Sequence, residues 1–305
     1  MRLPIALHDV WRKNAPELTG LFDGSLPDFV TARKPLDTYL GVPVFCYHLV
    51  EGEGLEADLS FLRHNGYHML SAAEFLAYLT EKSDIPERSV MLTFDDGPRN
   101  FHDVAFPLLR AYAARAVAFV APGLHTDEGT GDEIAARPMD WRQLGEIHAS
   151  GLVEIQSHTF ESRYVPRWPA PAALVGCEPR LEAARRRSTP LPLRDDLLLS
   201  RTMLEERLPG ARIRHLSFPM YIGTAEAVEI ARSVGFDACY WGYRPNRPLN
   251  LAGDSPFFVS RVGDEFLRRL PGDGRATVGD MMRERIRRIR AGRKWRRRFR
   301  SGDPA

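Results

Sequence analysis

The chain has 305 residues, of which 44% are hydrophobic and 27% are charged, and its formal net charge is +2. These values are typical of a globular protein and exclude collagen-like, low-complexity and fully disordered chains. Cys46, Cys177 and Cys239 lie far apart and form no C-x-x-C pair, which also excludes zinc ribbons and disulfide scaffolds.

Hydrophobic patterning predicts an α/β protein in which strands and helices alternate. Residues 1–40 are weakly patterned and are expected to form an N-terminal lead-in that packs on the body. Strands are predicted, in chain order, at 42–47, 89–94, 116–120, 152–156, 213–218, 236–240 and 257–262. Helices are predicted between them at 55–65, from the Ser71–Glu74 capping box onward, and at 101–114, 140–150, 196–208 and 224–234. Such alternation is typical of a mostly parallel sheet or barrel.

One domain is expected over residues 41–270, followed by a basic helical tail over 271–305. Within the domain, residues 163–194 carry six prolines and predict a long surface insertion. In the tail, residues 283–300 hold 11 Lys/Arg against one acid. That composition suits an anionic membrane surface or nucleic acid, or simply a solvated terminus. Of the two partners we expect the membrane surface and no nucleic acid.

Polar side chains follow four of the predicted strands, where ligands bind in parallel α/β folds. His48, the pair Asp95-Asp96, His158 and Tyr221 occupy these positions. Two adjacent carboxylates are costly to hold unless a cation lies near them. A divalent metal would satisfy one carboxylate and His158, leaving the other carboxylate as a base toward water. The alternative is an ordinary Asp-Gly-Pro turn and a hydrogen-bonded core histidine.

Four segments together resemble the polysaccharide deacetylases (NodB homology, carbohydrate esterase family 4). They are TFDDGP at 93–98, SHT at 157–159, SFPMY at 217–221 and VPVFCYHLV at 42–50, the last resembling the permuted branch that includes the poly-N-acetylglucosamine deacetylases. The resemblance spans roughly residues 40–262. It implies a distorted (β/α)7-type barrel.

The resemblance also implies a role for each matching residue. Asp95 would be the general base that deprotonates the attacking water, and His48 the general acid that protonates the leaving amine. Asp96 and His158 would hold a divalent metal, usually zinc. A backbone N–H near Met220 or Tyr221 would help to bind the tetrahedral oxyanion.

The sequence departs from the family pattern at the metal site. The family has a second histidine one helical turn after the first, but no histidine follows His158 until His215. Catalytic zinc normally has three protein ligands, so Glu161 is the best candidate replacement, although a solvated surface acid is the alternative for this residue. Met220 also stands where a tyrosine usually follows the proline.

Two further residues are candidates for substrate binding. Trp241 follows a predicted strand and could stack on a sugar, or could be part of a packed loop. Arg99 could bind an anionic group of the substrate, or could pair with a local carboxylate.

The predicted function is metal-dependent hydrolysis of an N-acyl group, expected to be N-acetyl, from an amino sugar or a lipid-linked glycan. The alternative is a catalytically inactive glycan-binding or scaffold protein that has lost a metal ligand. The N-terminus turns polar too early for a signal peptide, so we expect a cytoplasmic protein, peripheral at the inner membrane face if the tail binds lipid.

Overall fold

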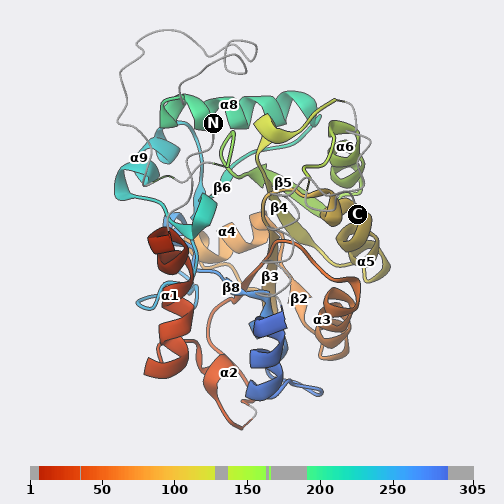
Figure 1. The fold of residues 1–305 in the computed structure, drawn as a ribbon, viewed down its shortest axis with the longest axis vertical. Coiled ribbons are helices and arrows are strands. Elements are labelled where there is room, and N and C mark those ends of the chain that lie inside the picture. Colours follow the sequence, from red (N-terminus) through yellow and green to blue (C-terminus); the bar gives the residue numbers. More distant parts are fainter. Residues whose placement is uncertain (1–6, 35, 128–136, 163–164, 166–190, 288–305) are drawn as a thin grey trace.

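Parallel strands form the centre of the molecule (Figure 1). The structure is a computed structural model that describes residues 7–34, 36–127, 137–162, 165 and 191–287. Strands lie side by side in the order β7-β6-β5-β4-β3-β1-β8, and the short β2 pairs with β3. Every one of these pairings is parallel. The strands are β1 (Val44–Tyr47), β2 (His68–Met69), β3 (Ser89–Phe94), β4 (Ala116–Val120), β5 (Val153–Ser157), β6 (His215–Ser217), β7 (Ala238–Tyr240) and β8 (Val262–Gly263).

The sheet curls toward a barrel because one segment contacts both of its edges. Val259 forms a parallel bridge with Tyr240 at the end of β7. Val262, which follows closely along the chain, pairs with Phe45 of β1. Arg261 lies between these two contacts, and its side chain is fully buried. The closing segment therefore brings a charged residue into the interior of the curled sheet.

Helices connect the strands and cover the sheet (Figure 1). They are α1 (Leu7–Asp23), α2 (Asp28–Thr31), α3 (Gly52–His64), α4 (Ala72–Glu81), α5 (Phe106–Ala111), α6 (Trp141–Ala149), α8 (Leu193–Arg207) and α9 (Ala225–Ser233). Shorter helical segments are η1 (Phe101–Ala105), η2 (Pro122–Leu124), η4 (Pro219–Tyr221), η5 (Pro256–Phe258) and η6 (Asp264–Arg269). Residues 278–287 are also helical.

Both faces of the sheet are buried, which explains why its strands are nearly continuous apolar runs. In β3, Leu92 belongs to the larger hydrophobic cluster, whereas Met91 belongs to a smaller cluster that also contains Phe75 of α4. In β4, Ala118 and Phe119 divide between the two clusters in the same way. The alternation of side chains along each strand therefore supplies both cores at once.

Several predicted elements are confirmed at or near their expected bounds. The strands at 89–94 and 116–120 are β3 and β4. The capping box at Ser71 and Glu74 begins α4 as expected. Asp140 and Thr224 are the N-caps of α6 and α9, because each side chain accepts a hydrogen bond from the backbone three residues later.

Other local expectations need correction. The weakly patterned lead-in contains the helix α1, whose bounds were not predicted from the sequence and which continues through Pro16. The helix expected at 101–114 is a π-helix, η1, followed by the short α5, and Ala113 beyond it has a left-handed φ of 49°. The strand expected at 257–262 is instead the 3-10 turn η5 followed by the two-residue β8.

The C-terminal tail is anchored where it leaves the body. Arg285 lies 3.2 Å from Glu17 of α1 and 2.9 Å from Glu265 of η6, and all three side chains are largely buried. The rest of the tail, 288–305, and most of the predicted insertion at 163–194 lie outside the described residues, although α8 already begins within that insertion. Within the described ranges, no helix is both long and apolar enough to cross a bilayer.

Candidate active site

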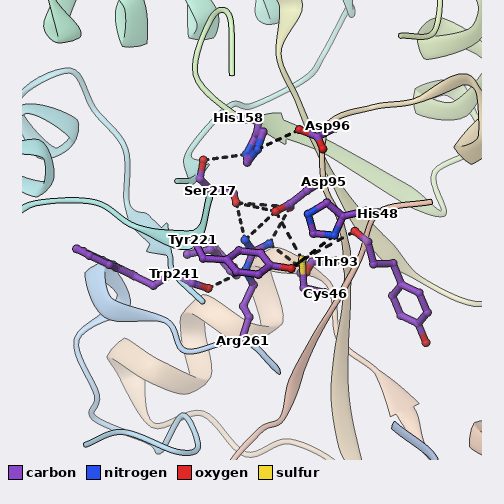
Figure 2. A network of polar contacts seen from close by, with 12 residues as sticks. Cys46, His48, Thr93, Asp95, Asp96, His158, Ser217, Tyr221, Trp241 and Arg261 are labelled. Atoms are coloured by element: carbon purple, nitrogen blue, oxygen red, sulfur yellow. Dashed lines mark hydrogen bonds and ion pairs between the residues drawn. The ribbon is translucent and has the colours of Figure 1, made fainter. Parts of the chain in front are cut away.

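The side chains predicted to act together come from the carboxyl ends of neighbouring strands (Figure 2). His48 follows β1, Asp95 and Asp96 follow β3, and His158 follows β5. Tyr221 ends η4, directly after β6. Because parallel strands end at the same edge of a sheet, residues separated by more than 100 positions lie within one polar network.

The centre of this network is a buried ion pair between Asp95 and Arg261. The Arg261 guanidinium donates from Nη1 to Asp95 Oδ1 at 2.7 Å and from Nη2 to Oδ2 at 2.8 Å. Ser217 Oγ lies 3.3 Å from Oδ2 and accepts a hydrogen bond from Arg261 Nη2 at 2.7 Å. Burial raises the pKa of Asp95, but Arg261, together with the charges of His158 and His48, brings that pKa down to about 2. Asp95 is therefore a carboxylate at every physiological pH.

Arg261 was not predicted from the sequence to belong to the site, and Ser217 was given no role of its own. Arg261 also donates from Nε to the Trp241 carbonyl at 2.9 Å, and its Nη1 lies 3.3 Å from Thr93 Oγ1. The available signal was one charged residue inside the apolar run FFVSRVG, at 257–263. A lone charge in such a run has to find a buried partner.

Asp96 and His158 face one another beside the ion pair. His158 Nε2 lies 3.5 Å from Asp96 Oδ1, and Ser162 Oγ donates to the same oxygen at 3.3 Å. On its other side, His158 Nδ1 donates to the Ser217 carbonyl at 3.0 Å, so Nε2 is the ring nitrogen that faces Asp96. Asp96 adopts a left-handed φ of 70°, and about half of its side chain is exposed.

This geometry fits two ligands of one divalent cation. Two donor atoms bound to a tetrahedral zinc at about 2.0–2.2 Å lie roughly 3.3–3.6 Å apart, which agrees with the separation between Asp96 and His158. The hydrogen bond from Nδ1 to a carbonyl is the arrangement that fixes the tautomer of a metal-binding histidine.

A different group of three potential ligands lies next to these two residues. Cys46, His48 and Asp95 form a possible metal-binding triad, with one ligand atom of each within 4.8 Å of the others. In that triad, however, Arg261 already neutralises the carboxylate. Asp96 and His158 therefore suit a cation better. Across the described part of the chain, Glu161 does not complete a group of three with Asp96 and His158, and its role as a ligand stays a prediction.

His48 lies on the other side of Asp95, next to Tyr221. The Tyr221 hydroxyl is 3.5 Å from His48 Nδ1 and 3.6 Å from Cys46 Sγ, and the Cys46 thiol in turn lies 3.5 Å from Asp95 Oδ2. Burial raises the pKa of Tyr221 well above its usual value, so the hydroxyl keeps its proton. The Tyr221 oxygen can therefore accept from Nδ1–H when His48 is an imidazolium, and the hydroxyl can donate to Nδ1 when His48 is neutral, so Nε2 is the nitrogen that can face a substrate.

The segment expected to bind the oxyanion has an unusual backbone. Met220 and Tyr221 are consecutive residues with left-handed φ values of 58° and 67°, a conformation that costs energy in residues other than glycine. The Tyr221 N–H donates to the Phe218 carbonyl at 3.0 Å. Among the described turns and loops, the Met220 N–H donates to no backbone carbonyl, so Met220 is the better candidate of the two for an oxyanion donor.

The surroundings of the two candidate substrate residues favour a packed loop for Trp241 and a local carboxylate partner for Arg99. Trp241 donates from Nε1 to the Phe257 carbonyl at 2.9 Å and packs on Phe218 and Phe258, and Figure 2 shows its ring directed away from Asp95. Arg99 pairs with Asp103 at 2.9 Å. Sugar stacking on Trp241 and anion binding by Arg99 stay predictions.

The comparison with protein families decides how this site is classified. The model of the polysaccharide deacetylase family matches residues 82–239, more than half of the chain. The chain belongs to the polysaccharide deacetylase family. The resemblance seen in the sequence motifs is thereby confirmed, and the Asp95-Asp96 turn and His158 lie within the matched region.

Individual relatives are similar to the chain over part of their length. The poly-beta-1,6-N-acetyl-D-glucosamine N-deacetylase of Escherichia coli (strain K12) is 34% identical over 122 residues, which are 38% of this chain and 18% of that protein. The enzyme of the same name from Staphylococcus epidermidis (strain ATCC 35984 / DSM 28319 / BCRC 17069 / CCUG 31568 / BM 3577 / RP62A) is 29% identical over 136 residues, covering 43% of this chain and 46% of its own. The chain thus matches less than half of either relative.

Solved structures support the fold assignment. IcaB from Ammonifex degensii has a TM-score of 0.57 and 25% sequence identity, covering 74% of this chain and 92% of that one. The curled parallel sheet with its surrounding helices is therefore the distorted (β/α) barrel that the sequence predicted.

Proposed function

We propose that this polysaccharide deacetylase hydrolyses an N-acyl group, N-acetyl above all, from an amino sugar of a glycan with the help of a divalent metal. One observation carries the proposal. Asp95, Asp96, His158 and His48 lie at one edge of the sheet, with a carboxylate held ionised by Arg261 at their centre.

In this proposal Asp95 accepts the proton of the attacking water. Its low pKa makes it a weak base, so the water must first become more acidic. Arg261 keeps the Asp95 carboxylate fixed in direction, because both of its oxygens are hydrogen-bonded to one rigid guanidinium.

Asp96 and His158 would hold the cation. A divalent metal there would supply a Lewis acid that polarises the acyl carbonyl and lowers the pKa of water toward 7. Ser217 orients His158 through its carbonyl and touches Asp95 through its hydroxyl, so one residue couples the metal side of the site to the base.

The remaining residues act on the acyl carbon and the leaving group. The Met220 N–H would donate to the oxygen that becomes negative as water adds to the carbonyl. His48 would protonate the departing amine, held in orientation by the Tyr221 hydroxyl. Base and acid therefore come from different strands, β3 and β1, on neighbouring sides of the substrate.

The test compares metal content and amine release in three variants, with N-acetylglucosamine oligomers as substrate. Asp96→Ala should lose the bound metal and the activity together, whereas Asp95→Asn should lose amine release and keep the metal. Asp103→Asn is the matched control, since Asp103 is a surface carboxylate paired with Arg99. Unchanged turnover in Asp95→Asn would remove Asp95 as the base, and full metal content in Asp96→Ala would remove Asp96 as a ligand.

A second candidate function is glycan binding without hydrolysis. Its support is the departure at the metal site, where no third side chain in the described ranges completes a group of three with Asp96 and His158. A chain that binds N-acetylglucosamine oligomers, holds no divalent metal between pH 6 and 8 and releases no amine would establish this alternative. If the unaltered chain does bind metal, Glu161→Ala tests the third ligand. Loss of bound metal in that variant would identify Glu161 as the third ligand.

Contact with a membrane surface through the basic tail is part of the same proposal. Arg285 is buried against Glu17 and Glu265, so a deletion that tests the tail should begin after residue 287. We expect the full chain to sediment with anionic liposomes and the shortened chain to stay in solution. Equal sedimentation of both would remove the tail as the membrane contact.

A further inference from the structure

Arg244 lies beside the candidate active site, on the loop that follows β7. The backbone N–H of Arg244 donates to Ser260 Oγ at 3.0 Å. Ser260 is next to Arg261 in the segment that closes the sheet. Gly242, two positions earlier, packs so closely on Tyr221 that a Cβ there would lie 2.5 Å from the Tyr221 Cβ. The backbone around Arg244 is thus fixed directly against two elements of the site.

The guanidinium of Arg244 is stacked on aromatic rings. Its Cζ lies 4.9 Å from the Trp241 ring and 5.1 Å from the Phe258 ring. Stacking uses the flat face of a guanidinium and leaves the N–H groups at its edge for an acceptor in the same plane. The residue is partly buried, so these N–H groups are partly removed from water.

The edge of this guanidinium has no acceptor in the described part of the chain. Arg244 Nε is buried without a hydrogen-bond partner, and no described carboxylate lies within ion-pair distance of Arg244. The neighbouring Arg247 is different, because it pairs with Asp254 at 3.2 Å and donates to two carbonyls. Burial, and then the charge of Arg247, lowers the pKa of Arg244, which reflects a cation without a compensating acid.

An unpaired cation that is partly removed from water binds oxyanions. Leaving a guanidinium without an acid partner costs free energy, which a carboxylate or phosphate bound to its accessible N–H groups recovers through charge-assisted hydrogen bonds. Arg99, for which the sequence left anion binding and a local carboxylate as alternatives, already has Asp103 as its partner. Arg244 has the geometry for that role.

We propose that Arg244, stacked on Trp241 and Phe258, forms a subsite for an oxyanion carried by the glycan. The oxyanion is a carboxylate or a phosphate ester on a sugar near the one that is deacylated. This inference rests on the proposed function, since it assigns a substrate class to the same site.

The experiment measures binding by calorimetry with matched pairs of probes. A hyaluronan tetrasaccharide, which contains glucuronate, is compared with neutral chitotetraose, and N-acetylglucosamine 6-phosphate is compared with N-acetylglucosamine. Each pair is titrated into the full chain, into Arg244→Gln and Arg244→Lys, and into Arg110→Gln. Arg110 is a matched control because it also stacks on a ring, that of Phe106, on the exposed surface of α5. Thermal unfolding of each variant confirms that it is folded.

We expect the unaltered chain to bind the acidic member of at least one pair about tenfold more tightly, as a charge-assisted hydrogen bond predicts. The pair that shows this preference distinguishes a carboxylate from a phosphate. Arg244→Gln should abolish the preference, Arg244→Lys should keep part of it, and Arg110→Gln should keep all of it. If Arg244→Gln does not fold, the comparison of Arg244→Lys with Arg110→Gln carries the test.

Equal binding of acidic and neutral probes by the unaltered chain would overturn the proposal, as would a preference that survives in Arg244→Gln. Amine release from the same probes is measured in parallel. An acidic preference that depends on Arg244, without any amine release, would support the subsite while removing the proposed reaction. Amine release, combined with binding that does not depend on Arg244 in either pair, would support the proposed reaction and remove the subsite.

Discussion

Replacing Arg261 with methionine removes the guanidinium and leaves the buried Asp95 carboxylate without a partner. Both side chains are at most 1% exposed, so water cannot replace the lost ion pair. Breaking a buried pair by removing one member costs about 3–5 kcal/mol. The variant also loses the donors to the Trp241 carbonyl and Ser217 Oγ.

The matched comparison is Arg99→Met, which breaks the pair between Arg99 and Asp103. Those side chains are 33% and 41% exposed, and a pair in that setting contributes about 0–1 kcal/mol. Urea unfolding of both variants measures the difference. In a third variant, Arg261→Met is combined with Asp95→Asn and leaves no buried charge, so it should recover part of the lost stability.

Activity gives a second measurement on the same variants. Without Arg261, burial favours the protonated form of Asp95, which cannot accept a proton from water. Amine release should therefore fall in Arg261→Met even where the protein is folded. A loss of unfolding free energy below 1 kcal/mol in Arg261→Met, equal to that in Arg99→Met, would refute the argument that Arg261 is needed to hold Asp95.

Three further predictions concern other parts of the site and the core. Tyr221→Phe should lower kcat by about 2- to 10-fold, measured by amine release, because it removes the hydrogen bond to His48; an effect confined to KM would contradict that role. Gly97→Ala should lower the melting temperature, since Gly97 has a φ of 60° and a Cβ there would lie 2.8 Å from Val120 Cγ1; an unchanged melting temperature would mean that the turn can rearrange. Burial lowers the pKa of His215 to about 4, so as the pH falls the unfolded chain takes up a proton near pH 6.5 and the folded chain only near pH 4. The free energy of unfolding, measured with urea, should therefore fall by about 3 kcal/mol between pH 7 and 4 because of this group. His215→Asn should flatten that part of the pH profile.

Local sequence signals predicted most of the elements and three strand ends of the site. The run at 89–94 is apolar on both faces and ends at Asp95, so its strand and the following turn could be predicted from neighbouring residues alone. The same holds for His158 after β5. Capping residues such as Ser71 and Thr224 act within one helical turn, which is why their helices began where expected.

Contacts between distant segments could not be predicted in this way. Arg261 is separated from Asp95 by 166 positions, and the two meet because the segment after β7 closes the sheet against β1. The partner of Arg285 on α1 is 268 positions away, and no local pattern specifies that distance.

The sequence by itself determined the alternation of strands and helices and which titratable groups follow β1, β3 and β5, because those features depend on residues a few positions apart. The tertiary structure decided which atoms those groups present to one another: the ion pair that keeps Asp95 charged, the carbonyl that orients His158, and the Arg244 Nε that finds no acceptor among the described residues. The physical reason is that periodicity reports the burial of a side chain, whereas the charge state and direction of a buried group depend on partners brought close by the closure of the sheet.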